Sequence, residues 1–188
     1  MALEIPTPRL LLRLPEPSEA DAVLDYFVRN REHLEPWSPV APDGMYTLHW
    51  WEQRLRMNLD EAEAGTSVRT FMYLRGGSNE VLGSCNLSNI MRGPFQACFL
   101  GYSIDAAVQG QGLMTEAVRA LVQYGFSALN LHRIMANYIP DNTGSGRVLE
   151  KAGFHREGLA PEYLQIAGRW QDHVLTAITN RSWRPEAG

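Results

Sequence analysis

One stretch of the sequence joins a strand to a helix through two glycines: Val108-Gln109-Gly110-Gln111-Gly112-Leu113-Met114-Thr115-Glu116-Ala117. The residues before it, from Gln96 to Ile104, are β-prone. After it, apolar residues recur at helical spacing to about Leu129. This order places the first helical turn, with its unpaired amides, beside the glycines. Because glycine lacks a Cβ atom, backbone N–H groups can converge there, and the segment predicts a cradle for phosphate.

Two other kinds of glycine-rich loop are excluded by the residues next to these glycines. No Gly-Lys-Ser/Thr comes after them, which excludes the loop of nucleotide hydrolases, and Gly-x-Gly-x-x-Gly is absent. Taken alone, the two glycines are equally compatible with a plain strand-to-helix turn. The choice between a plain turn and a binding site therefore depends on motifs elsewhere in the chain.

The segments around the cradle alternate between β-prone and helical patterns. Arg9 to Leu14 predicts a first strand, and Ser18 with Asp21 predicts a helix N-cap before an amphipathic helix. Thr47 is expected to cap a second helix, which ends at Gly65. Further segments are expected in this order: strands at 68–74, 81–90 and 96–104, the helix from about Met114 to Leu129, a strand at 134–139, a helix at 145–152 and a hairpin turning at Ala167-Gly168.

This alternation predicts a single α/β domain over residues 1–188, with its core at about 8–182. A mixed, twisted sheet of about seven strands flanked by about four helices fits the order of the segments. The two tryptophans in the second predicted helix, Trp50 and Trp51, lie in an amphipathic segment, so at least one of them is expected in the core.

Composition bounds the kind of protein. The chain has 17 Lys and Arg against 21 Asp and Glu, a net charge of −4, which argues against extended nucleic-acid contact and favours a cationic partner. Two cysteines, Cys85 and Cys98, and five scattered histidines give no disulfide framework and no zinc-ligand spacing, so no metal is expected. No apolar run reaches the ~18 residues of a membrane span, and charges at Glu4, Arg9 and Arg13 interrupt any signal-peptide core, so no membrane contact is expected. The low cysteine count favours a reducing compartment, and a cytoplasmic protein is expected.

Two segments in the expected order carry a family resemblance. The first is Gln109-Gly110-Gln111-Gly112-Leu113-Met114, and the second begins at Asn142-Thr-Gly-Ser145 and ends at Gly153-Phe154. Together they resemble the GCN5-related N-acetyltransferase (GNAT) superfamily. Leu34-Glu-Pro-Trp37, Gly83 to Phe95, Leu131 to Tyr138 and Gly168 to Val174 extend the likeness to ribosomal-protein-alanine N-acetyltransferases of the RimJ/RimL type, over nearly the whole chain.

The resemblance implies that acetyl-CoA is the cosubstrate and that it sits where the sheet splays open. Main-chain amides of the glycine segment would bind its pyrophosphate, and the second segment would line its pantetheine arm. The cofactor-binding residues implied are Ile104, Gln109, Gly110, Gln111, Gly112, Leu113, Met114, Asn142 and Ser145.

The resemblance also assigns the proton transfers. Many superfamily members have a tyrosine one turn before Gly-Phe as the acid for the thiolate, but this chain has Leu149 there. In the RimJ/RimL-like branch a serine fills that role, which implies Ser145; a hydroxyl that only satisfies backbone donors at the helix start is the competing interpretation. Glu162, before Tyr163, is the implied base acting through water, with an ordinary edge carboxylate as the alternative and Glu157 as the other candidate.

The implied acceptor is the N-terminal alanine of a ribosomal protein, in the small ribosomal subunit, with Trp37, Asn86 and Tyr138 as substrate-binding residues. Trp37 could instead anchor its loop. Two other functions remain open on the residues: acetylation of a small amine such as an amino sugar or polyamine, and a CoA-binding ribosome-assembly factor. Cys85 and Cys98 are expected to be buried thiols, and His173 to satisfy a hydrogen bond near the site.

Overall fold

The strands form one mixed sheet in the order β1-β2-β3-β4-β5-β6-β8-β7. The computed structural model describes residues 3–185. The strands are β1 (Glu4–Pro6), β2 (Leu10–Arg13), β3 (Val68–Leu74), β4 (Gly83–Met91), β5 (Ala97–Ile104), β6 (Arg133–Tyr138), β7 (His155–Ile166) and β8 (Arg169–Thr179). The helices are α1 (Ala20–Arg29), α2 (Arg31–Leu34), α3 (Leu48–Glu63), α4 (Leu113–Ser127) and α5 (Thr143–Ala152), with 3-10 turns η1 (Pro17–Glu19), η2 (Glu35–Trp37) and η3 (Ala106–Val108).

The predicted α/β class is confirmed, with one strand and one helix more than expected. The extra strand, β1, pairs antiparallel with β2, and the extra helix is the short α2. Strands β3, β4 and β5, at the three places predicted, form an antiparallel meander, and β7 and β8 form the predicted hairpin. Among the described helices, none combines the length and the apolar character that crossing a membrane would require.

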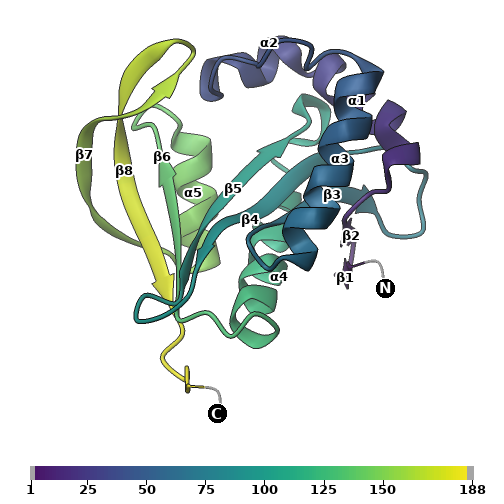
Figure 1. Ribbon diagram of the computed structural model, residues 1–188. Coiled ribbons are helices and arrows are strands. Elements are labelled where there is room, and N and C mark those ends of the chain that lie inside the picture. Colours follow the sequence, from purple (N-terminus) through teal and green to yellow (C-terminus); the bar gives the residue numbers. More distant parts are fainter. Residues whose placement is uncertain (1–2, 186–188) are drawn as a thin grey trace.

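Helices cover both faces of the sheet (Figure 1). α4 and α5 pack on one face, where Leu113, Val118 and Leu121 of α4 lie in a buried cluster with side chains of β2, β4 and β5. α1 and α3 cover the other face over β3 with a second, aromatic cluster. There Trp51 stacks on Phe27 with ring centroids 4.6 Å apart, which confirms that one of the two neighbouring tryptophans is a core residue.

The helix ends follow from local capping chemistry. Thr47 accepts a hydrogen bond from the Trp50 amide and begins α3 as predicted. The cap predicted at Ser18 is wrong, because Pro17 starts a 3-10 turn one residue earlier and the Glu19 carboxylate accepts from the Glu16 amide at 2.9 Å. α1 then begins at Ala20.

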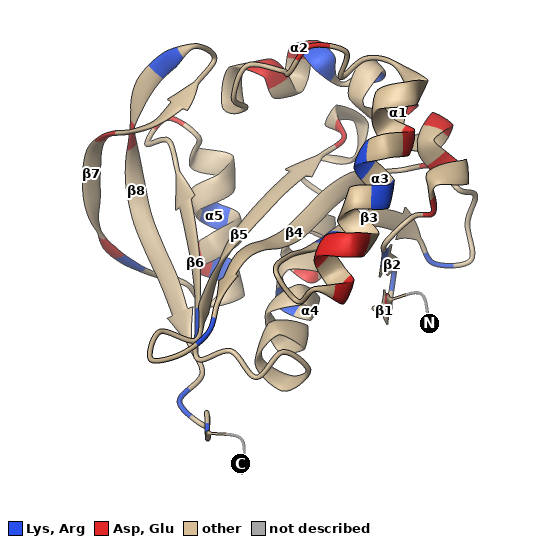
Figure 2. Cartoon of the chain, in the orientation of Figure 1, with Lys and Arg blue, Asp and Glu red and all other residues tan. Residues whose placement is uncertain are grey.

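The sheet opens between β5 and β6. These two strands are parallel and pair only at Ala97, Cys98 and Phe99, opposite residues 133–135. Beyond Phe99 they diverge, and Figure 1 shows the resulting gap in the ribbon, with α5 behind it. The splay expected between the two halves of the sheet is therefore present. β4 and β5 carry no charged residue along their length (Figure 2), so the strands on this side of the opening are electrically neutral.

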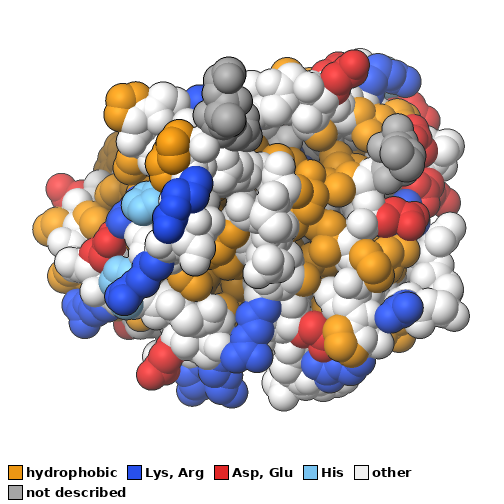
Figure 3. All heavy atoms as spheres, turned by 90° about the horizontal axis from the view of Figure 1, so that it is seen from below, with side chains coloured by type: hydrophobic (Ala, Val, Ile, Leu, Met, Phe, Trp, Pro, Cys, Tyr) orange, Lys and Arg blue, Asp and Glu red, His pale blue; other side chains and the backbone are white. Residues whose placement is uncertain are grey.

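The end of the molecule opposite the opening has a mixed surface. Seen from below, apolar side chains are exposed along the middle, with Lys, Arg and acidic side chains around them (Figure 3). Phe95, 46% exposed in the turn between β4 and β5, is one of the large apolar side chains left in water. No field of a single sign covers this face.

Candidate active site

The glycine segment forms a turn that only glycine adopts without strain. Gly110 has φ +74° and Gly112 has φ +76°, and Gly112 is the N-cap residue of α4. A Cβ atom on Gly110 would meet nothing within 4 Å, so the space over the turn is open. Leu113 and Met114 bury their side chains in the core, which leaves their backbone amides at the helix start. This geometry fits a phosphate group held by main-chain donors.

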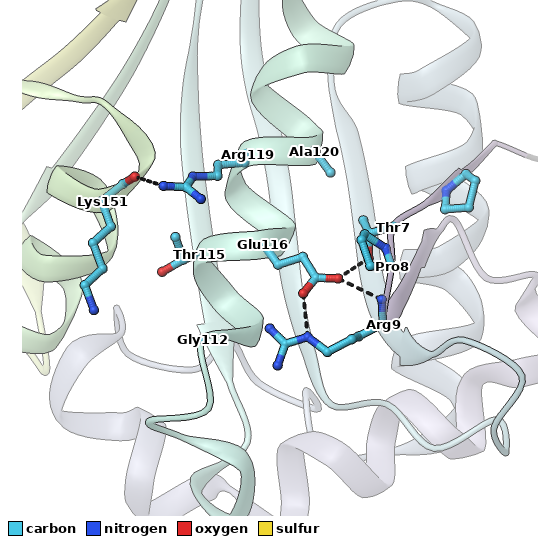
Figure 4. A pocket seen from close by; sticks show the side chains of 10 residues that line it. Thr7, Pro8, Arg9, Gly112, Thr115, Glu116, Arg119, Ala120 and Lys151 are labelled. Carbon is cyan, nitrogen blue, oxygen red and sulfur yellow. Dashed lines mark hydrogen bonds and ion pairs between the residues drawn. The ribbon is translucent and has the colours of Figure 1, made fainter.

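The segment between β1 and β2 fixes the glycine turn through hydrogen bonds. Arg9 donates to the Gln111 carbonyl at 3.0 Å and to the Glu116 carboxylate at 2.7 Å, and the Thr7 hydroxyl donates to the same carboxylate at 2.6 Å (Figure 4). Burial raises the pKa of Glu116, but the hydrogen bonds from Thr7 and Arg9 outweigh it and hold the pKa below its usual value. The turn is therefore fixed by an ionised clamp.

Beside this clamp lies an open cavity of about 620 Å³, lined by the first turns of α4, the β1–β2 turn and the end of α5. Figure 4 shows Arg9, Arg119 and Lys151 around it, with Arg119 donating to the Lys151 carbonyl. The one carboxylate in the lining, Glu116, is paired with Arg9. The surface next to the glycine turn therefore carries a positive excess.

The N-terminal helices reach the glycine turn from the other side. Gln109 and His33 of α2 are hydrogen-bonded, side chain to side chain, at 2.9 Å. Beyond η2, the Ser38 carbonyl accepts from the Ala167 amide at the tip of the β7–β8 hairpin, at 2.9 Å. The segment between α2 and Ser38 thus crosses the upper end of the split, which is the opening between β5 and β6. Trp37 lies on this segment, at the end of η2, and is 41% exposed.

Ser145 lies in the first turn of α5, at the edge of the split. Asn142 caps this helix by accepting from the Ser145 amide at 3.0 Å, so the cap comes from the asparagine and not from the serine hydroxyl. The Ser145 hydroxyl instead meets the Tyr102 hydroxyl of β5 at 2.7 Å. Leu149, where many superfamily members have a tyrosine, is 1% exposed and belongs to the core.

Asn86 faces the side of the sheet opposite Ser145. Its neighbours Cys85 and Leu87 belong to the cluster under α4, so alternation along β4 turns Asn86 to the other face. Its Oδ1 atom is buried and has no hydrogen-bond partner among the described residues. Opposite it in register is Gly101 of β5, which is exposed and has open space where a Cβ would lie. A buried acceptor beside an open strand surface is suited to a ligand that donates a hydrogen bond.

Comparison with known proteins identifies the family. The model of the acetyltransferase (GNAT) domain matches residues 9–155, most of the chain. This chain belongs to the GNAT acetyltransferase family. The acetyltransferase is 42% identical, over 97% of its length and 94% of the relative's, to the [ribosomal protein uS5]-alanine N-acetyltransferase of Escherichia coli.

Solved structures of similar enzymes share the fold of this GNAT acetyltransferase. The ribosomal-protein-S5-alanine acetyltransferase of Vibrio fischeri superposes with a TM-score of 0.92 at 38% identity, covering 97% of this chain and 100% of that one. RimJ of Mycobacterium smegmatis, in complex with CoA-disulfide, gives a TM-score of 0.86 at 30% identity, covering 98% and 88%. The α/β class and the open mixed sheet are thus those of the family.

Glu162 and Glu157 have different surroundings in the acetyltransferase. Glu162 is exposed on β7, in a bulge between Ala160 and Leu164, with φ +46° and its amide donating to Asp172 at 2.9 Å. Glu157 is ion-paired with Arg133. The bulge sets the direction of the Glu162 side chain at the cost of a strained backbone, whereas the Glu157 carboxylate is already engaged.

The structure does not bring all the expected substrate residues together in this GNAT enzyme. Tyr138 packs with the cluster under α4 and α5, where a Cβ on Gly146 would come 3.0 Å from its ring, whereas Asn86 lies on the other face. On Asn86's face, in the second half of the sheet, Asn137 donates to the Tyr163 hydroxyl at 3.2 Å. The His173 ring lies 5.5 Å from Tyr163, and its Nδ1 is bonded to the Gln171 carbonyl, as expected for a satisfied histidine.

The two cysteines of the acetyltransferase are buried thiols, as predicted. Cys85 and Cys98 are both 0% exposed, and burial raises the pKa of Cys98 to about 12. Neither forms a reactive thiolate at neutral pH. Within residues 3–185, no group of three or more His, Cys, Asp or Glu side chains is arranged to hold a metal ion.

Two residues of the site were missed by sequence reasoning: Tyr102 and His33. Tyr102 lies 43 positions from Ser145, and His33 lies 76 from Gln109. Neither belongs to a motif, so no local pattern marked them. For Tyr102 the sequence held a weak signal. Side chains alternate along the strand before the glycine turn, and this alternation places the Tyr102 phenol on the face where α5 packs.

Proposed function

We propose that this acetyltransferase moves the acetyl group of acetyl-CoA to the α-amine of an N-terminal alanine in a ribosomal protein of the small subunit. The observation that carries the proposal is the 42% identity, over 97% of the chain, to an enzyme named for the alanine of ribosomal protein uS5. A likeness over the whole chain includes the segments outside the cofactor site, and those are the segments that meet the acceptor.

The glycine turn fits the cosubstrate. Amides of residues 110–114 would hold the pyrophosphate, aided by the positive excess around Arg9, Arg119 and Lys151. Asn142 and Ser145, at the start of α5, would line the pantetheine arm within the split. When bound, acetyl-CoA supplies an activated acetyl group as a thioester.

Two residues, Ser145 and Glu162, are proposed to carry out the proton transfers. The acceptor amine attacks as the neutral form, so it gives up one proton before the carbon–nitrogen bond forms and another afterwards, while the leaving thiolate takes one. Ser145 is the proposed donor to the thiolate. Glu162, acting through water, is the proposed acceptor of the amine's proton, since its carboxylate is exposed on the hairpin that meets the Trp37 segment.

The acceptor is proposed to enter beneath the segment that carries Trp37. Glu35 is exposed on this segment and Glu32 on the adjoining α2, next to the exposed Arg31 (Figure 2). The two carboxylates outnumber the one guanidinium, and this acidic excess suits a basic peptide. Asn86 Oδ1 would accept from the incoming amine or the first peptide amide, and Tyr138 would contribute through the packing of α5. An α-amine has an ordinary pKa of about 7.7–8.0, so it asks less of the base than a lysine amine near 10.4.

The test is mass spectrometry of ribosomal proteins incubated with the enzyme and acetyl-CoA. We expect one added acetyl group on the N-terminal peptide of a small-subunit protein that begins with alanine. Acetylation of an amino sugar or polyamine, with none on any ribosomal protein, would assign the enzyme to small amines instead. Binding of CoA with no turnover on either class would favour an assembly factor.

Replacing Trp37 by alanine should lower kcat/KM for an Ala-initiated peptide by about 10-fold, because an aromatic contact at an entrance contributes more than about 1 kcal/mol when truncated. Enlarging the first residue of the peptide from alanine to leucine should lower it as well, since a larger side chain crowds the approach of the amine. Steady-state assays on matched peptides measure both effects. Phe95→Ala is the control, because Phe95 is similarly exposed but lies at the other end of β5; equal losses in the two variants would remove Trp37 from the acceptor site.

Glu162→Gln should slow the reaction most at about pH 6.5–7 and progressively less above about pH 8. The reason is that the α-amine, with an ordinary pKa of about 7.7–8.0, becomes neutral without help as the pH rises. The ratio of variant to wild-type kcat/KM across this range is the measurement. Glu157→Gln is the matched control, and it should change stability through the lost Arg133 pair while leaving the ratio flat. A flat ratio for Glu162→Gln would exclude it as the base.

A further inference from the structure

The hydroxyl groups of Tyr102 and Ser145 meet across the opening of the sheet. Tyr102 belongs to β5 and Ser145 to α5, which follows β6. The last backbone pair between β5 and β6 is at Phe99, three residues before Tyr102. The side chains therefore touch beyond the point at which the strands separate, on the two sides of the split where the proposed function seats the thioester.

The distances leave two proton arrangements for this pair. The Tyr102 hydroxyl lies 2.7 Å from Ser145 Oγ and 3.2 Å from the Ser145 carbonyl oxygen. In one arrangement the phenol donates to the carbonyl, and the serine hydroxyl donates to the phenol oxygen. In the other the phenol donates to Ser145 Oγ, and the serine proton is free for another acceptor. Each hydroxyl always has a partner, so the exchange between arrangements leaves no buried polar group unsatisfied.

Tyr102 keeps its proton at neutral pH. Burial among the side chains of the α4 cluster raises the pKa of Tyr102 well above its ordinary value, and the Ser145 bond only partly offsets this. The Ser145 amide is fixed by Asn142, so the serine backbone does not move when its hydroxyl rotates. Position 149, with its buried leucine, supplies no phenol from α5 itself.

We propose that Tyr102 is a positioning residue for acetyl transfer, aiming the Ser145 hydroxyl at the leaving sulfur and replacing its proton. This rests on the proposed function. In the step, the amine nitrogen bonds to the thioester carbonyl carbon and the carbon–sulfur bond breaks. The thiolate takes the proton of Ser145 Oγ, and Ser145 takes the proton of Tyr102. Tyr102 is reprotonated by the proton that the new amide nitrogen releases through water, so no co-reactant is needed.

Three variants and one control test the proposal. Tyr102→Phe removes only the hydroxyl, Ser145→Ala removes its partner, and the third variant combines them. We expect Tyr102→Phe to lower kcat about 10-fold with the KM for acetyl-CoA within about 2-fold of wild type. The double variant should be no slower than Ser145→Ala alone, because Tyr102 acts only through Ser145.

Tyr26→Phe is the matched control, since the buried Tyr26 hydroxyl meets Ser103 Oγ at 2.8 Å on the other face of the sheet. It removes the same kind of hydroxyl pair, so it should lower the melting temperature while kcat stays within about 2-fold of wild type. If Tyr102→Phe behaves like Tyr26→Phe, or if its loss adds fully to that of Ser145→Ala, the proposal is wrong.

The rate of every variant is measured as a ratio to the wild-type rate, which separates the role of Tyr102 from the identity of the acceptor. If wild type acetylates a small amine and not the Ala-initiated peptide, the proposed acceptor fails, and the ratio measured on that amine still decides the role of Tyr102. If wild type transfers acetyl to no amine, both proposals fall.

Discussion

Ser145→Ala should lower kcat roughly 100-fold or more while the KM for acetyl-CoA changes little. A positioned proton donor raises the rate of such a transfer by about 10²–10⁴-fold, because protonating the sulfur as the carbon–sulfur bond breaks lowers the barrier to that step. The effect falls on kcat because the cap of α5 is Asn142, so the helix start stays intact when the serine hydroxyl is lost. Steady-state kinetics with both substrates varied provide the measurement.

Thr143→Ala is the control for this first prediction. Thr143 is exposed in the same turn of α5, and its replacement by alanine removes a hydroxyl together with one methyl group. Its kcat should remain near the wild-type value. A Ser145→Ala enzyme with unchanged kcat and a raised KM would make Ser145 a binding residue and leave the thiolate to be protonated by water.

Gly110→Val should weaken acetyl-CoA binding at least about 10-fold and lower the stability of the free enzyme. The side chain would enter the open space over the turn, and a β-branched residue at φ +74° is strained by about 1–3 kcal/mol. Isothermal titration gives the affinity, and thermal unfolding with and without acetyl-CoA gives the stability. The ligand-induced rise in melting temperature should shrink with the affinity.

Gly93→Val separates the two effects. Gly93 has φ +69° and open surroundings, as Gly110 does, but it lies in the turn between β4 and β5 at the far end of the sheet. We expect a similar loss of stability with no change in affinity. If both variants bind acetyl-CoA as wild type does, the glycine turn is not the phosphate cradle.

Patterns within one element were readable from the sequence. Helical periodicity predicts the buried face of α4. The Thr47 cap and the Gly110 turn each depend on one residue and the backbone next to it. β1 escaped prediction because three residues ending at a proline have no periodicity to detect. The Ser18 cap failed because Pro17 favours an earlier turn, a competition between neighbours that a motif does not weigh.

Contacts between elements were not readable in the same way. The Tyr102–Ser145 pair depends on how far β5 and β6 diverge, and no residue of either strand encodes that distance locally. The bulge at Glu162 depends on the pairing of β7 with β8, which shifts register between Ala160 and Leu164. Family resemblance supplied the positions of Ser145 and Glu162, and only the fold supplied their neighbours.

The strand order has a consequence for synthesis of the chain. β8 lies inside the sheet between β6 and β7, although it is the last of the described strands to be made. While a ribosome is still adding residues before Arg169, β6 has only its three short pairs with β5, and β7 still lacks the strand with which it pairs. The half of the enzyme carrying Glu162 can therefore assemble only when residues up to about Thr179 have emerged. Until then a nascent chain lacks the half of the sheet that holds the proposed base, even if the glycine turn at the start of α4 is already formed.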